Sequence, residues 1–162
     1  MKKIGFIGAG NMATAIIKGL MAQNDGKADF INVFDVSEEK CAAMKNMGAN
    51  VMTSADEIAK NSSIVVLAVK PQNYPEVLES LKNSITTAKT VVSIAAGISI
   101  AYVRKGLECD CPVVRVMPNT PLLLKRVQQL FVRLRISAMM TKLSFTICLQ
   151  AAVFANILTK AI

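Results

Sequence analysis

The 162-residue sequence contains no histidine and no tryptophan. Without histidine, Ser-His and Cys-His nucleophilic pairs cannot form, and most zinc sites lose a usual ligand. The cysteines are few, and the spacing of Cys41, Cys109, Cys111 and Cys148 fits no CxxC metal pattern. We therefore expect no metal site, free thiols in a reducing cytoplasm, and chemistry that depends on a cofactor, carboxylates, amines or hydroxyls.

Acidic residues and glycine are absent from the last part of the chain. Residues 1–124 contain 13 Lys and Arg, all 11 Asp and Glu and all 8 Gly, whereas residues 125–162 contain 6 Lys and Arg and no acid. Because the positive charge is concentrated in this tail, it does not indicate a nucleic-acid partner. Leu143–Leu158 is apolar but shorter than the roughly 20 residues that a membrane span needs, so no membrane partner is expected.

Short apolar runs alternate with helical patterns as far as Leu124. The pattern predicts strands at 3–8, 31–34, 51–52, 63–69, 90–94 and 113–117. It predicts helices at 11–23, between Ser37 and Gly48, after Ser54, at 75–82 and at 100–105. This alternation is typical of an α/β fold with a doubly wound parallel sheet. We expect residues 1–124 to form one Rossmann domain and residues 125–162 to form an irregular or helical tail without a domain of its own.

The segment Gly8–Ala13 reads G-x-G-x-x-A, and it lies between the first predicted strand and the first predicted helix. In this context Gly8 permits a tight turn, Gly10 leaves room for a pyrophosphate, and Ala13 allows the helix to pack closely on the sheet. The helix N-terminus then offers N–H groups and partial positive charge to the phosphates. The alternative is a glycine-rich turn in an ordinary α/β fold.

Asp35 ends the second predicted strand, 22 residues after Ala13. A carboxylate at this place accepts a hydrogen bond from the adenosine ribose 2′-OH and repels a 2′-phosphate. The following residues, 36–39, supply no arginine for such a phosphate, so NAD(P)H is the expected cofactor, with NADH favoured. The alternative role for Asp35 is to cap the next helix.

Two further segments follow predicted strands at the edge where open α/β sheets bind ligands. They are Ala68–Gln72, which contains Lys70, and Val116–Pro121, which contains Asn119. A solvated surface lysine and a simple turn residue are the alternatives for these two positions.

Four stretches together resemble the pyrroline-5-carboxylate reductase family: IGFIGAGNMATAI at 4–16, LAVKPQ at 67–72, SIAAGI at 93–98 and RVMPNTP at 115–121. The resemblance implies NAD(P)H-dependent reduction of a C=N bond, converting 1-pyrroline-5-carboxylate to L-proline in a homo-oligomeric enzyme. It implies that the pyrophosphate is held by Gly8, Gly10, Asn11, Met12 and Ala13. It also implies that Val69 and Lys70 line the ribose and nicotinamide side, with Ala96 and Asn119 nearby. Ala55 departs from the family, which often has a cofactor-contacting Asn there.

The family's helical C-terminal domain forms the dimer and supplies the substrate carboxylate site and a proton-donating Thr. Residues 125–162 resemble nothing in that domain, so we assign no catalytic residue to this chain. Back-translated and read two bases later, permitted codons for 125–132 spell K-G-A-T-A-L-C, a family sequence, and 135–141 and 146–152 also give family-like peptides in the same frame. The sequence therefore favours a frameshifted tail and a truncated enzyme. The alternatives are a genuine divergent tail such as a basic amphipathic helix, a non-catalytic dinucleotide-binding module, and a fragment of a β-hydroxyacid-type reductase.

Overall fold

The computed structural model describes residues 3–22 and 24–116, together with two short strands at 131–134 and 147–148. The strands are β1 (Ile4–Ile7), β2 (Ile31–Phe34), β3 (Asn50–Val51), β4 (Ile64–Leu67), β5 (Thr90–Ser93), β6 (Val113–Val116), β7 (Phe131–Leu134) and β8 (Ile147–Cys148). The helices are α1 (Asn11–Ala22), α2 (Glu38–Asn46), α3 (Ala55–Asn61), α4 (Tyr74–Leu81) and α5 (Ile100–Leu107), with a 3-10 turn, η1 (Pro71–Asn73), directly before α4.

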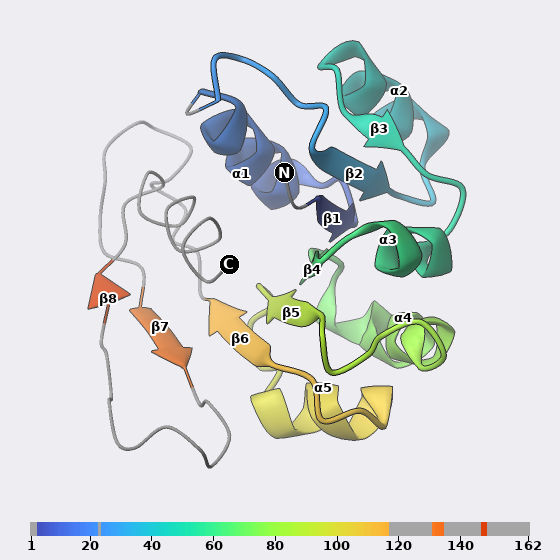
Figure 1. The fold of residues 1–162 in the computed structure, drawn as a ribbon, viewed down its shortest axis with the longest axis vertical. Coiled ribbons are helices and arrows are strands. Elements are labelled where there is room, and N and C mark those ends of the chain that lie inside the picture. The colour runs from blue at the N-terminus through green and yellow to red at the C-terminus, as the bar shows by residue number, and fades with distance from the viewer. Residues whose placement is uncertain (1–2, 23, 117–130, 135–146, 149–162) are drawn as a thin grey trace.

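The strands form one sheet in the order β3-β2-β1-β4-β5-β6-β7-β8 (Figure 1). The first six strands pair in parallel, and their order is that of the doubly wound Rossmann dinucleotide-binding fold. The predicted fold class is therefore confirmed. The order reverses between β1 and β4, and ligands of such sheets bind outside the carboxyl ends of the strands at this point.

The described residues of the tail are strands, whereas the sequence predicted an irregular or helical segment. β7 pairs antiparallel with β6, and β8 pairs antiparallel with β7. Without β7, strand β6 would present a row of unpaired N–H and C=O groups at the edge of the sheet.

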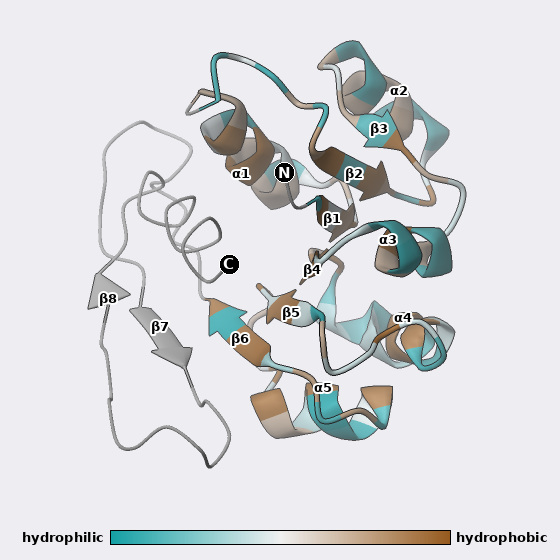
Figure 2. Cartoon of the chain, in the orientation of Figure 1, coloured by the Kyte–Doolittle hydropathy of each residue, from teal (hydrophilic) through white to brown (hydrophobic). Residues whose placement is uncertain are grey.

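Alternate residues of the strands face two separate apolar layers. Phe6 and Val66 belong to the layer that packs against α1 and α2. Ile7 and Leu67 belong to the layer that packs against α3, α4 and α5. Helices therefore cover both faces of the sheet, and the central strands are its most apolar part (Figures 1 and 2). Burial on both faces explains why the strands read as nearly continuous apolar runs.

Most predicted helix boundaries lie within one or two residues of the observed ones. Gly48 follows the end of α2, where Gly48 N–H donates to Lys45 O at 2.9 Å and Ala49 N–H donates to Met44 O at 3.1 Å. Ser37 is the N-cap residue of α2, but its side chain makes no capping hydrogen bond. Helix α4 begins one residue before Pro75 because Pro71–Asn73 already forms a turn of 3-10 helix that leads into it.

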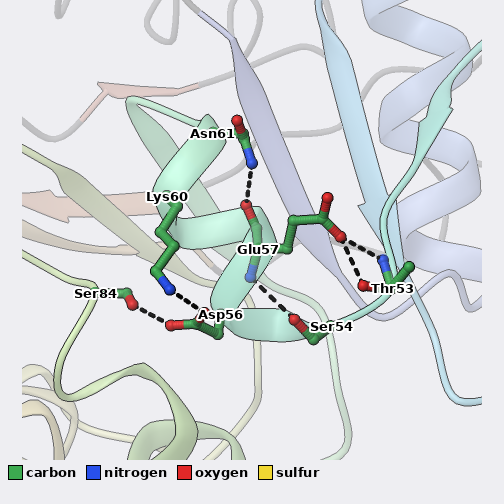
Figure 3. A network of polar contacts seen from close by, with 7 residues as sticks. All are labelled: Thr53, Ser54, Asp56, Glu57, Lys60, Asn61 and Ser84. Carbon is green, nitrogen blue, oxygen red and sulfur yellow. Dashed lines mark hydrogen bonds and ion pairs between the residues drawn. The ribbon is translucent and has the colours of Figure 1, made fainter.

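A polar network fixes the start of α3 (Figure 3). Glu57 N–H donates to Ser54 Oγ at 3.1 Å, and the Glu57 carboxylate accepts from the backbone N–H and hydroxyl of Thr53 at 2.7 and 2.8 Å. These bonds from Thr53 hold the pKa of Glu57 below its usual value. Asp56 accepts from Lys60 and from Ser84, which holds the pKa of Asp56 below its usual value as well. The donors and acceptors of this network bond to one another, so we interpret the network as structural.

Candidate functional site

The loop between β1 and α1 passes very close to the end of β4. Gly8 has φ +100°, a left-handed conformation that residues with a side chain rarely adopt. A Cβ at this position would lie 2.6 Å from the carbonyl oxygen of Ala68. Gly8 N–H donates to Phe34 O at 2.7 Å, and Ala68 N–H donates to Ile7 O at 2.8 Å, so the loop is anchored to both neighbouring strands. Glycine is required at position 8 for conformation and for space.

The space beside Gly10 is open. Apart from its chain neighbours, no atom of residues 3–22 or 24–116 would lie within 4 Å of a Cβ at position 10. Directly after it, the 12-residue helix α1 begins with exposed Asn11 and half-buried Met12, and it has no acidic residue in its first turn. The first N–H groups of a helix lack intrahelical acceptors and carry partial positive charge. Ala13 is 1% exposed and packs in the core, so the loop has the shape and the polarity that a dinucleotide pyrophosphate needs.

Asp35 ties this loop to the turn after β2. Its Oδ2 accepts the Ala9 N–H at 2.7 Å, and its Oδ1 accepts the Ser37 N–H at 2.9 Å. The side chain is only 8% exposed, and Lys40 Nζ lies 3.6 Å from Oδ2. The bond to Ser37 is an Asx turn that precedes α2; Ser37 is the N-cap residue of that helix, so Asp35 caps none of its helical N–H groups. A carboxylate has about four acceptor sites, so Asp35 retains capacity for a ribose hydroxyl.

Lys40 was not among the residues predicted from the sequence, because only residues 36–39 were considered as the source of a cation; it lies in the first turn of α2. The side chain of Lys40 is half exposed, and it brings a positive charge close to the carboxylate of Asp35. The sequence could have indicated Lys40, since a lysine in the first turn of the helix after Asp35 lies close to that carboxylate.

Three further predicted residues follow β4 and β5, on the other side of the loop between β1 and α1. Val69 is half-buried and Lys70 is exposed after β4, and Ala96 is exposed after β5. The carboxyl ends of these strands are adjacent, since Leu67 pairs with Ser93. Asn119 lies outside the described residues. Ala55 is 7% exposed in the apolar layer under α3, and its methyl group offers no hydrogen bond to a ligand.

Sequence reasoning also missed a buried polar group beneath these loops. The hydroxyl of Tyr74 lies 3.1 Å from Leu67 O and 2.9 Å from Ser93 Oγ. Desolvation raises the pKa of Tyr74, so the group is a neutral hydroxyl. The register of β4 against β5 pairs Leu67 with Ser93, and the start of α4 places Tyr74 beside them. No local pattern in the sequence signals this combination.

Neither a metal centre nor a membrane helix is found in the part of the chain that the structure describes. No group of three or more His, Cys, Asp or Glu side chains is placed to hold a metal ion among these residues. The described helices are all too short or too polar to cross a membrane. Cys41, Cys109 and Cys111 are free thiols.

Comparison with known proteins agrees with the geometry. The family model described as NADP oxidoreductase, coenzyme F420-dependent, matches residues 3–97. A pyrroline-5-carboxylate reductase of Escherichia coli (strain K12) is 42% identical over 123 residues, which make up 75% of this chain and 46% of that protein. A pyrroline-5-carboxylate reductase of Methanosarcina acetivorans is 41% identical over 119 residues, 73% of this chain and 44% of that protein.

Two solved structures show the same likeness. A pyrroline-5-carboxylate reductase from Coxiella burnetii matches with a TM-score of 0.72 and 35% identity, covering 82% of this chain and 48% of that one. The pyrroline carboxylate reductase of Plasmodium falciparum with NADP bound matches with a TM-score of 0.71 and 29% identity, covering 85% of this chain and 50% of that one. The chain spans about half the length of the curated relatives it matches. The resemblance expected from the four motifs is confirmed, and the chain belongs to the family described as NADP oxidoreductase, coenzyme F420-dependent.

Proposed function

We propose that residues 1–124 bind NAD(P)H across the carboxyl edge of the sheet. The observation that carries this proposal is the open space beside Gly10, at the point where α1 begins and the strand order reverses. The pyrophosphate would lie against Gly8, Gly10, Asn11, Met12 and Ala13. Asp35 on the β2 side would accept the adenosine ribose hydroxyl. Val69, Lys70 and Ala96 on the β4 and β5 side would then line the nicotinamide half, with Asn119 following β6.

We further propose that the chain is the cofactor half of a pyrroline-5-carboxylate reductase. The bound cofactor would supply a hydride to the carbon of the C=N bond, while a proton reaches the nitrogen, giving L-proline. The residues of this chain orient the dinucleotide and exclude water from its buried side. We place no residue that donates the proton or holds the substrate carboxylate within 1–124, and a cytoplasmic location stays a prediction.

NADH is the proposed preference, because the carboxylate of Asp35 would oppose a 2′-phosphate. Lys40 reduces this opposition, and the matched family and the Plasmodium falciparum relative are both described with NADP. Titration of the chain with each cofactor tests the preference. Tighter binding of NADPH by about tenfold, or 1.4 kcal/mol, would overturn the role given to Asp35.

The half-length match favours a second candidate function, a module that binds the dinucleotide without catalysis.

We propose that the tail after Leu124 is translated in a shifted frame, and the 123-residue length of the match to the Escherichia coli protein supports that boundary. The test compares the chain as written with one whose frame is restored after Leu124, by pyrroline-5-carboxylate-dependent oxidation of NADH. Correct positioning of reactants supplies several kcal/mol of a barrier, so we expect activity only from the restored chain. Similar turnover by both chains would show that the tail is functional and the frameshift interpretation is wrong.

A further inference from the structure

The hydroxyl of Tyr74 lies between the carboxyl ends of two central strands. Tyr74 is 0% exposed and Ser93 is 1% exposed. The tyrosine O–H donates to the carbonyl oxygen of Leu67, the last residue of β4, and shares a hydrogen bond with the hydroxyl of Ser93, the last residue of β5. One buried group therefore connects the ends of both strands at the points where they enter their loops.

These contacts hold the two loops on which the proposed nicotinamide half depends. Residues 68–70 begin directly after Leu67, and residues 94–97 begin directly after Ser93. Tyr74 is also the first residue of α4, which follows the loop after Leu67. Its side chain reaches back to Leu67, so it connects the end of that loop to its beginning. The direct backbone contact here is long, with Ile94 N–H 3.4 Å from Leu67 O. The tyrosine hydroxyl strengthens the junction where the ladder between β4 and β5 ends.

Filling the core does not explain the hydroxyl. A phenylalanine ring would occupy the same apolar layer without burying a hydroxyl of its own, but it would take a partner from the buried Ser93 hydroxyl. Burying the hydroxyl is tolerated because Leu67 and Ser93 both bond to it. Its effect is to fix the spacing between the loop after β4 and the loop after β5.

We propose that Tyr74 is a positioning residue for the nicotinamide end of the cofactor. This inference rests on the proposed function. If the pyrophosphate lies at the start of α1 and the adenosine lies toward Asp35 on β2, the nicotinamide lies on the opposite side, over β4 and β5. The nicotinamide would contact Val69, Lys70 and Ala96. Tyr74 does not touch the ligand; it acts by holding the loops that carry these residues.

The test compares two ligands on the 162-residue chain by isothermal titration: NADH, and ADP-ribose, which lacks the nicotinamide. In the wild type we expect NADH to bind more tightly than ADP-ribose. In Tyr74→Phe we expect NADH binding to weaken by about fivefold, the loss typical of one hydrogen bond, while ADP-ribose binding changes less than about twofold. Tyr102→Phe is the matched control, because Tyr102 is 43% exposed on α5, and it should change neither affinity.

A second variant covers poor folding of Tyr74→Phe. Ser93→Ala removes the partner hydroxyl and keeps the ring, and the same selective loss of NADH binding is expected. Equal weakening of both ligands, no weakening of either, or equal wild-type affinity for both ligands would overturn the positioning role alone. Failure of the wild type to bind either ligand would overturn the proposed function itself, and the role of Tyr74 with it.

Discussion

A side chain at position 10 would enter the space that we assign to the pyrophosphate. Because a Cβ there would meet no atom of the described residues within 4 Å, chain neighbours aside, Gly10→Val should fold normally, with a free energy of unfolding within about 1 kcal/mol of the wild type. The same substitution should weaken NADH binding by more than about tenfold. Thermal unfolding and an NADH fluorescence titration measure the two effects. Unchanged affinity in a folded variant would show that the dinucleotide lies elsewhere.

Lys40 should decide how well the chain tolerates a 2′-phosphate. Its ammonium lies 3.6 Å from the Asp35 carboxylate and is half exposed, so it is placed to compensate a second negative charge. Lys40→Met should weaken NADPH binding by about three- to tenfold, with little effect on NADH, and the difference should shrink at high salt. Lys45→Met, later on the same helix, is the control. Equal loss of both cofactors in Lys40→Met would refute this role.

At the residue scale, the sequence alone predicts the role of a residue when that role depends on residues nearby in the chain. Gly8, Gly10 and Asp35 belong to a motif with fixed spacing between a strand and a helix, and that spacing reveals their places. The bond from Ala9 to Asp35 joins residues 26 positions apart. The contacts of Tyr74 depend on the register of β4 against β5 and on the place where α4 begins. Such contacts follow from tertiary packing, which no local pattern encodes.

Helix α3 should contribute acid-sensitive stability. The pKa of Glu57 and the pKa of Asp56 are both lowered in the folded chain, by hydrogen bonds from Thr53 and Lys60 respectively. A carboxyl group with a lowered pKa stabilises the fold above its unfolded pKa, and that contribution is lost as the pH falls through the folded value. We expect the free energy of unfolding to decrease as the pH falls below the ordinary values of 4.5 and 3.8.

Urea unfolding between pH 7 and about pH 3 measures this loss. Glu57→Gln should be less stable than the wild type at neutral pH and should lose less stability in acid, so the two curves approach each other. Glu76→Gln, an exposed glutamate on α4, should follow the wild type. A Glu57→Gln curve parallel to the wild-type curve over the whole range would contradict the assignment.

At the element scale, the six parallel strands and five helices are predicted because buried strands read as apolar runs and the helices repeat near 3.6 residues. The start of α4 is predicted one residue late, since the signal from Pro75 is strong and the turn at Pro71–Asn73 has no clear periodicity. Strands β7 and β8 are not predicted. They pair with an edge strand, and the need for such pairing is a property of the assembled sheet.

At the scale of the whole molecule, the described elements form one sheet with a single proposed dinucleotide edge. The strand order places the glycine loop at the reversal point, and the sheet brings Asp35 and the β4 and β5 loops to the same edge. The chain spans about half the length of the curated relatives it matches. We therefore propose that residues 1–124 bind the dinucleotide and that turnover needs the longer chain of the relatives.

The most direct test of whether this chain binds a dinucleotide without turning it over is a calorimetric titration of the 162-residue chain with NADH. We predict saturable binding with one dinucleotide per chain, and no oxidation of the bound NADH when 1-pyrroline-5-carboxylate is added. Rapid oxidation would contradict the separation of binding from turnover. Absence of saturable binding to a chain whose circular dichroism shows it to be folded would contradict the claim that this sheet edge is a dinucleotide site.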